Sequence, residues 1–264
     1  MKLPITAIIL TFNEELNLEK CLKSVAGRAS EIFVVDSYST DKTLEIAKKY
    51  GAIVAKNPFK DQAQQFNWAL DNLEIKSEWI LKLDADEEVL PELWAEIEKV
   101  LPNAPEGITG FEMKRRVYFM EHWMKHGGYY PVWFLRLWRK GRARSEVRRM
   151  DEHIILSDGK SDRLNNDFID NNLNGLSHWI KKHRNYAVRE AEEVYFGGYG
   201  TGSKRNIYYR TPAFLRVFLY FTYRYFFQLG FLDGISGTKF HFLHGFWYRW
   251  IVDKEVYKLY KNRK

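Results

Sequence analysis

The sequence predicts an α/β fold, in which a mostly parallel central sheet is flanked by helices and followed by a C-terminal helical, amphipathic region. Two observations lead to this prediction. Through the first hundred residues, short apolar runs alternate with helical segments of about ten to fifteen residues, which is typical of βαβ units and a parallel sheet. The last part of the chain instead combines a basic excess with aromatic residues that recur at three- and four-residue steps, which favours amphipathic helices.

The strands and helices of this sheet follow one another in a regular order. Short apolar runs predict four strands, at residues 5–10, 32–35, 52–55 and 79–84. The turn at 11–14 leads into a helix that ends near Val25, an N-cap at 39–41 begins a helix that ends near Tyr50, and a third helix covers 62–73. Pro91 is typical of the first turn of a helix, and apolar residues recur at helical spacing after it: Leu93, Trp94, Ile97, Val100 and Leu101.

Polar residues follow three of the predicted strands. Asn13 and Glu14 follow the first strand, Asp36 closes the second, and Asp84 and Asp86 come at the end of the fourth. The carboxyl ends of parallel strands share one edge of a sheet, and open α/β sheets bind their ligands beyond that edge. We therefore expect a nucleotide-binding cleft there.

The fourth strand ends in a cluster of acids. Four carboxylates occupy residues 84–88, and such crowding is unfavourable unless a cation or another partner neutralises it. A ligand set made of oxygen alone suits Mg²⁺ or Mn²⁺, so Asp84 and Asp86 are predicted to form a metal site. Glu87 and Glu88 have a plainer interpretation, because acids also stabilise the N-terminus of a helix.

Length and composition limit the domain organisation. A chain of 264 residues can hold one large domain with an appendage. We expect one domain at 1–203, with a nucleotide-binding half at about 1–100 and a second half at about 101–203, and a separate region at 204–264. Cys21 is the single cysteine and is expected to be a packed thiol, so a disulfide framework is excluded. The N-terminus lacks the cleavage site of a secretory signal, which favours a cytoplasmic location.

The C-terminal region carries the positive charge of the chain. The formal net charge is +7, of which residues 204–264 contribute +9 and the remainder −2. The same region holds nineteen of the 43 aromatic residues. Charged residues interrupt it too often for a spanning helix, which needs roughly 20 apolar residues in a row. Glycines at 230, 234 and 237 predict at least two helices, which would lie on an anionic membrane surface or pack against protein, including a second copy of the chain.

Several motifs carry a resemblance to a known family. Those in the first hundred residues are Ile-Ile-Leu-Thr-Phe-Asn-Glu at 8–14, Val-Val-Asp-Ser-Tyr-Ser-Thr-Asp at 34–41, Gln-Phe-Asn-Trp-Ala at 65–69 and Leu-Asp-Ala-Asp-Glu at 83–87. In this order and spacing they resemble family 2 glycosyltransferases of the GT-A fold, and the last is the Asp-x-Asp motif of that fold. Later motifs, at 130–139, 151–153, 178–191 and 230–237, resemble the bacterial lipopolysaccharide-core subgroup that includes the heptose β-1,4-glucosyltransferases. No Gly-x-Gly-x-x-Gly follows the first strand, which argues against a dinucleotide-binding domain.

The resemblance implies a nucleoside-diphosphate sugar as donor, usually a UDP-sugar. Asp36 would then accept a hydrogen bond from the base, and Thr11, Asn13 and Glu14 would line the same pocket, partly through their backbone.

The Asp-x-Asp motif would hold the rest of the donor. Asp84 would contact the ribose or the metal, and Asp86 would bind Mg²⁺ or Mn²⁺ between the two phosphates. A cation there stabilises the negative charge that the leaving diphosphate gains.

Inverting transfer in one displacement needs a base that takes the proton of the acceptor hydroxyl. The resemblance implies Glu152 as this base, with Asp151 as its neighbour or substitute, although family members often read Glu-Asp or His-Glu at this point. The alternative is an ordinary acidic turn, neutralised by Arg148 and Arg149.

Three further residues are candidates for the donor site. Arg136 and Arg139 belong to a basic stretch and could bind the diphosphate, since guanidinium groups pair with phosphate oxygens in a bidentate manner. His178 is a candidate third metal ligand, because some GT-A enzymes use a late histidine in this role. A packed or solvent-facing histidine is the alternative.

The expected function is therefore an inverting, metal-dependent glycosyltransferase that moves a sugar to a lipid-linked or lipopolysaccharide-core saccharide. Its expected location is cytoplasmic, peripheral on the inner face of the cytoplasmic membrane, with a homo-oligomer through the C-terminal region left open. Nucleic acid is not expected as a partner, because the acidic strand ends would repel its phosphates. A sugar nucleotidyltransferase and a non-catalytic membrane adaptor are the alternatives.

Overall fold

The computed structural model describes residues 2–146, 153–196 and 211–262. It divides into two compact units, residues 1–116 with 131–173 and residues 117–130 with 174–264. In chain order, the elements of the first unit are β1 (Leu3–Thr11), α1 (Leu18–Val25), β2 (Ala29–Asp36), α2 (Thr43–Lys49), β3 (Ile53–Lys56), α3 (Gln62–Asn72), β4 (Trp79–Asp84), β5 (Glu87–Val89), α4 (Pro91–Val100), η1 (Leu101–Asn103), β6 (Ile108–Phe119), β8 (Trp133–Arg139), β9 (Ala143–Ser145), β10 (Ile154–Leu156) and β11 (Lys160–Asn171).

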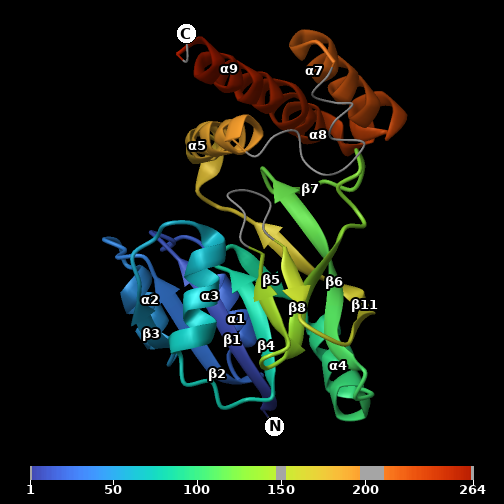
Figure 1. Cartoon of the computed structure of the whole chain (residues 1–264). Coiled ribbons are helices and arrows are strands. Elements are labelled where there is room, and N and C mark those ends of the chain that lie inside the picture. The colour runs from blue at the N-terminus through green and yellow to red at the C-terminus, as the bar shows by residue number, and fades with distance from the viewer. Residues whose placement is uncertain (1, 147–152, 197–210, 263–264) are drawn as a thin grey trace. The chain divides into compact units, whose positions relative to one another are not determined.

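The central sheet has the strand order β3-β2-β1-β4-β8-β6-β11-β5 (Figure 1). Strands β1 to β4 pair in parallel, as the alternation of strands and helices predicts. β8 enters beside β4 in the antiparallel direction and pairs on its other side with β6. The predicted α/β sheet with flanking helices is confirmed, and its four predicted strands lie within β1, β2, β4 and, apart from one residue, β3.

Both faces of this sheet are covered, because successive side chains of a strand point to opposite faces. From β1, Ile5, Ala7 and Ile9 pack into one core with residues of α1 and α4. Ile8 points the other way and packs into a second core with Phe66 of α3. Burial on both faces explains why β1 and β4 read as continuous apolar runs.

The second unit contains the end of β6 and the segments that follow the sheet. Its other elements are β7 (His122–Trp123), α5 (Gly175–Phe196), α7 (Ala213–Thr222), the π-helical turn η2 (Tyr223–Phe227), η3 (Gly230–Asp233), α8 (Gly234–His241), η4 (Phe242–Trp247) and α9 (Tyr248–Lys261). α5 packs along α9 through buried side chains at three- and four-residue spacing: Ala187, Ala191 and Val194 against Tyr248, Val252 and Val256. The predicted domain at 1–203 includes residues 174–196, whereas in the structure α5 shares its core with α9.

The C-terminal segment forms a helical hairpin, as its glycines predict. α7 and η2 make the first arm, the chain breaks between Phe227 and Gly234, and α8 begins the second arm. Gly234 has a φ of +69°, which a residue with a side chain rarely adopts. Within the described ranges, no helix combines the length and the apolar character that crossing a bilayer requires.

Because the second unit contains buried histidines, we expect the stability of the fold to decrease at acidic pH. Burial lowers the pKa of His183 and of His241 from 6.5 to about 4. In the unfolded chain both would titrate near 6.5, so between pH 6.5 and 4 the unfolded state binds protons that the folded state does not. Stability should therefore be lost as the pH falls through this range.

Urea unfolding followed by near-UV circular dichroism at pH 7, 5.5 and 4.5 would measure this loss. In a His183→Phe variant, which keeps an aromatic ring against Trp179, the loss should be smaller by roughly 2–3 kcal/mol, since one pKa unit corresponds to about 1.4 kcal/mol. Identical pH profiles for the two proteins would show that His183 is not held neutral by burial.

Candidate active site

The predicted site residues of the first unit gather at one edge of the sheet. Thr11 pairs with Asp36 across β1 and β2, and Leu10 pairs with Asp84 across β1 and β4. The carboxyl ends of three parallel strands are therefore adjacent. This register agrees with the expectation that the strand ends followed by Asn13 and Glu14, by Asp36 and by Asp84 and Asp86 share one edge.

The loops that follow β1 and β2 are held together by hydrogen bonds to Asp36. Its buried carboxylate accepts from the backbone N–H of Ser39 at 2.9 Å, from the hydroxyl of Ser39, and from the hydroxyl of Thr11 at 3.3 Å. Asn13 donates its backbone N–H to Ser39 Oγ at 2.8 Å and accepts from the N–H of Thr40 at 2.9 Å. Asp36 thus orders the loop after β2 and ties it to the loop after β1.

Two details of these loops show how their backbone is held. Asn13 has a φ of +54°, a conformation that asparagine tolerates better than most residues. Glu14 donates its backbone N–H to Thr43 Oγ1 at 2.8 Å, and its carboxylate accepts from Asn17 at 2.6 Å. Thr11, Asn13, Glu14 and Asp36 therefore lie in one hydrogen-bonded substructure.

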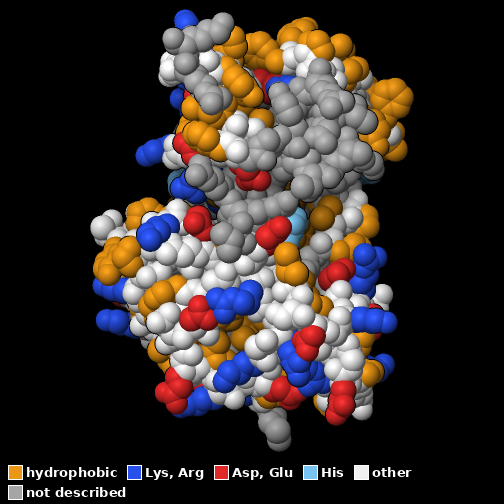
Figure 2. Space-filling model, viewed as in Figure 1, with side chains coloured by type: hydrophobic (Ala, Val, Ile, Leu, Met, Phe, Trp, Pro, Cys, Tyr) orange, Lys and Arg blue, Asp and Glu red, His pale blue; other side chains and the backbone are white. Residues whose placement is uncertain are grey.

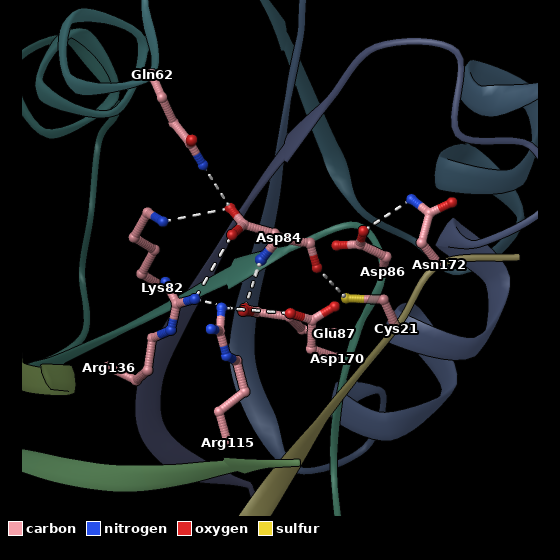
Figure 3. Close-up of polar contacts among 10 residues, drawn as sticks. All are labelled: Cys21, Gln62, Lys82, Asp84, Asp86, Glu87, Arg115, Arg136, Asp170 and Asn172. Carbon is pink, nitrogen blue, oxygen red and sulfur yellow. Dashed lines mark hydrogen bonds and ion pairs between the residues drawn. The ribbon is translucent and has the colours of Figure 1, made fainter. Parts of the chain in front are cut away.

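Asp84 closes β4 and is surrounded by donors. Its Oδ1 accepts from Gln62 at 3.0 Å and lies 3.3 Å from the ammonium of Lys82, and its Oδ2 lies 3.5 Å from the guanidinium of Arg136 (Figure 3). About a quarter of the side chain, 28%, stays exposed. Asp84 is thus oriented by neighbours that carry positive charge.

Asp86 lies in the turn between β4 and β5 and points away from Asp84, toward Asn172 (Figure 3). Its Oδ2 accepts from Asn172 at 2.9 Å, and its backbone carbonyl accepts from the N–H of Asn171 at 2.9 Å. Its Oδ1 accepts no hydrogen bond within the described part of the chain. The turn is therefore clamped to the end of β11, and one carboxylate oxygen remains available.

The structure corrects the interpretation that Glu87 stabilises the N-terminus of a helix. Glu87 does not lie in the first turn of α4, which begins at Pro91, but in β5, where its carboxyl is buried and in ion-pair contact with Arg136. Its Oε2 also accepts the backbone N–H of Asp84 at 2.9 Å. Burial raises the pKa of Glu87 to about 8, with Asp84 adding to the rise and Arg136 opposing it.

Three buried or half-buried cations complete the charged cluster, which we define as Lys82, Asp84, Glu87, Arg115, Arg136 and Asp170. Arg115 of β6 lies 3.3 Å from the carboxylate of Asp170 on β11. Burial lowers the pKa of Lys82, although Asp84 opposes the shift. Burial alone would also lower the pKa of Arg136, but Glu87, Asp84 and Asp170 outweigh it and raise that pKa. The cluster alternates in sign, so the acids at the end of β4 are largely neutralised by the protein itself.

The oxygen atoms at this edge could bind a divalent cation at Asp86. Its available oxygen is a hard ligand of the kind that Mg²⁺ and Mn²⁺ prefer. Asp84, by contrast, has its oxygens committed to Gln62, Lys82 and Arg136. Among the residues that the structure describes, no group of three or more His, Cys, Asp and Glu side chains could hold a metal without other ligands. Oxygens of a bound diphosphate and water would have to complete the coordination.

Arg139 is placed away from this edge, which corrects the expectation that it binds the diphosphate. It pairs with Trp79 at the opposite end of β4. There it forms an ion pair with Glu78 and donates to the carbonyl of Ala104 at 3.2 Å. Because β8 runs antiparallel to β4, each residue after Arg136 lies about 3.3 Å farther from the site.

Of the remaining predicted residues, Arg136 alone lies in the described part of the first unit. Arg136 is present, but as the partner of Glu87 and Asp84. His178 lies on α5 in the second unit, and its role as a metal ligand stays a prediction. Asp151 and Glu152 fall outside the described residues.

Sequence reasoning missed several members of the site. Lys82 had a detectable signal, because a lysine within the apolar run 79–83 of a buried strand needs a partner. Arg115, Asp170 and Asn172 had none, since they come from later strands whose register cannot be read from the sequence.

Comparison with known proteins bears on the chemistry of this edge. The family model described as glycosyl transferase family 2 matches residues 6–154, more than half of the chain. The chain belongs to this family. The resemblance of the motifs at 8–14, 34–41, 65–69 and 83–87 to family 2 glycosyltransferases is therefore confirmed.

Two relatives and one solved structure illustrate how far the similarity reaches. An uncharacterized glycosyltransferase of Rickettsia bellii is 44% identical over 96 residues, which cover 36% of this glycosyltransferase and 32% of that protein. The lipopolysaccharide core biosynthesis glycosyltransferase LpsC of Rhizobium meliloti is 28% identical over 92% of this chain and 90% of its own. The crystal structure of S. aureus TarS in complex with UDP-GlcNAc has 17% identity and a TM-score of 0.49, covering 72% of this chain and 66% of that one. The chain thus spans about a third of the length of the Rickettsia protein. The substrates and partners of this chain are therefore proposed below.

Proposed function

We propose that this family 2 glycosyltransferase transfers a hexose, with inversion, from a UDP-sugar to a hydroxyl of a lipid-linked or lipopolysaccharide-core saccharide. The observation that carries the proposal is the shared edge of β1, β2 and β4. It brings the Thr11–Asp36 substructure, suited to a nucleoside, next to the acids at the end of β4, suited to the diphosphate side of a donor.

The residues on the nucleoside side would bind and orient the base. Asp36 is already held by Ser39 and Thr11, which both donate their hydroxyls to its Oδ1. Its Oδ2 accepts the backbone N–H of Ser39 and has a second lone pair that can accept from the N–H of a pyrimidine. The backbone around Asn13 and Glu14 would form the wall of the pocket. Because these contacts exist without donor, little ordering would be needed on binding.

On the diphosphate side, Asp86 would hold Mg²⁺ or Mn²⁺, and Asp84 would orient the ribose. A bound divalent cation stabilises the negative charge that the diphosphate gains as leaving group. Arg136 and Lys82 would hold the carboxylate of Asp84 in place, and Asn172 that of Asp86. His178 remains a candidate additional ligand.

Glu152 would remove the proton from the acceptor hydroxyl as the acceptor oxygen attacks the anomeric carbon, with Asp151 as its neighbour. A carboxylate suits this role, because an inverting transfer in one step needs a base that accepts the proton of the acceptor hydroxyl. This assignment rests on the sequence motif at 151–153.

The acceptor class is suggested by the similarity to LpsC, which extends along nearly the whole chain. A saccharide anchored at the inner face of the cytoplasmic membrane would also give a purpose to the basic, aromatic C-terminal region. Mg²⁺ and Mn²⁺ are both compatible with the oxygen ligands of the site.

A donor panel tests the proposal. UDP-glucose and other nucleotide sugars, with and without Mn²⁺, would be incubated with the purified chain, and released UDP would be measured with and without a saccharide acceptor.

Glu152→Gln should lower the transfer rate by about 10²- to 10⁴-fold with donor affinity nearly unchanged, and Asp151→Asn provides the matched control. Near-normal turnover of Glu152→Gln would move the base elsewhere. Pyrophosphate release from a nucleoside triphosphate and a sugar phosphate would instead indicate a nucleotidyltransferase, and no donor binding at all would favour an adaptor.

A further inference from the structure

The helical hairpin of the second unit exposes large apolar side chains along one arm and around its turn. Six of them define what we call the hairpin face: Phe214, Leu219, Phe226, Phe227, Leu232 and Ile235. Phe227 is 76% exposed and Ile235 is 79% exposed, the highest fractions among the large hydrophobic residues of the described chain. Figure 2 shows hydrophobic side chains gathered on the surface that α7 occupies in Figure 1. Large apolar side chains that gather on an exposed surface in this way mark an interaction site.

The turn of the hairpin is built with its polar groups inside. In η3 the buried residues are Gly230 and Asp233, while Phe231 and Leu232 are exposed. The buried carboxylate of Asp233 accepts from His126 Nδ1 at 2.6 Å and from the backbone N–H of His126 at 3.0 Å. This is the reverse of ordinary burial, in which apolar side chains leave water and acids stay in it.

Close glycine contacts hold this arrangement in place. A Cβ added at Gly237 would lie 2.3 Å from Cβ of Asp233, and one at Gly127 would lie 1.9 Å from Cε1 of His241. Only glycine fits at these two points, so the chain approaches Asp233 and His241 as closely as it can. The outward direction of the neighbouring apolar residues is therefore fixed by packing and is not a consequence of fraying.

The charges near the hairpin face identify its partner. Between residues 211 and 252 the single acid is Asp233, and it is buried. The exposed cation Lys239 accompanies the apolar residues of the hairpin. Apolar and aromatic side chains together with Lys239, and no exposed carboxylate between residues 211 and 252, are the composition that suits an anionic bilayer. In a symmetric dimer through the same face, Lys239 would meet no exposed acid on the hairpin of the second copy.

We propose that the hairpin face inserts into the interfacial layer of an anionic lipid bilayer. Phe227, Leu232 and Ile235 at the turn enter the boundary between headgroups and acyl chains, and Lys239 stays at the level of the lipid phosphates. The proposal gives the proposed glycosyltransferase a route to a lipid-anchored acceptor and rests on the proposed function in that respect alone. Binding to lipid needs neither donor nor catalysis.

Flotation of the full chain with vesicles tests this proposal. Wild-type protein should float with vesicles that contain anionic phosphatidylglycerol and should float less with pure phosphatidylcholine. The variant Phe227→Glu/Ile235→Glu should partition into the vesicle fraction at least tenfold less. The control Ile53→Glu/Tyr257→Glu changes the charge equally at exposed positions of β3 and α9 and should float like the wild type.

Thermal unfolding of the variants and a sedimentation measurement separate the outcomes. Equal melting temperatures would show that the exposed substitutions leave the fold intact. Equal flotation of the hairpin variant and the wild type would overturn the proposal, as would a dimer in sedimentation that only the hairpin variant abolishes. Release of UDP from a UDP-sugar with a water-soluble acceptor reports on the proposed function alone, because it does not depend on vesicles.

Discussion

Asp86→Asn is expected to abolish metal-dependent binding of a UDP-sugar and to lower the transfer rate by about 10³-fold, because a Lewis-acid contribution of several kcal/mol is lost. Asparagine has nearly the same shape and keeps an oxygen that can accept from Asn172, which donates to Asp86 at 2.9 Å. The substitution therefore removes the charge of the available oxygen and little else.

Calorimetric titration with UDP-glucose, with and without Mn²⁺, measures this effect directly. Glu88→Gln is the matched control, since Glu88 lies two residues along the chain in β5, and it should bind like the wild type. Asp84→Asn is a poorer probe, because it would leave Lys82 and Arg136 short of a counter-charge and would disturb folding as well as binding. An Asp86→Asn protein whose donor binding still requires Mn²⁺ would show that the metal is held elsewhere.

At pH 9, above the pKa of about 8 that burial gives Glu87, Arg136→Met is expected to destabilise the chain by about 3–5 kcal/mol, because it leaves the ionised Glu87 buried without its cation. The double variant Arg136→Met/Glu87→Gln should recover most of this loss, since neither charge then remains unpaired. The comparison distinguishes the cost of an unpaired charge from the packing change at residue 136.

Urea unfolding of the wild type and the variants would give the free energies of this cycle. Arg144→Met is the matched control, because Arg144 forms a bidentate pair with Asp71 at 2.7 and 2.8 Å on a half-exposed surface. Its removal should cost less than about 1 kcal/mol, since water screens exposed ion pairs. A loss for Arg136→Met as small as for Arg144→Met would mean that Glu87 is neutral in the folded protein and needs no cation.

The order of strands and helices was predictable because their signals are local. Apolar runs, a proline at the start of α4 and the glycines of the hairpin each act within a few residues. The structure has strands and helices where these signals predict them. The adjacency of Thr11, Asp36 and Asp84 followed as well, since parallel strands end at one edge whatever their exact register.

The sequence by itself thus determined the family, the parallel half of the sheet, the edge at which the site lies and the helical hairpin. Only the tertiary structure decided which charges meet there. Arg136 and Arg139 are equivalent as residues of one basic stretch, yet the antiparallel direction of β8 brings the first to Asp84 and carries the second to the other end of β4. Glu87 reads as part of a helix start, but pairing with β11 buries it beside Arg136. Such contacts join residues about fifty positions apart, and their register depends on the packing of the whole sheet, which no local pattern encodes.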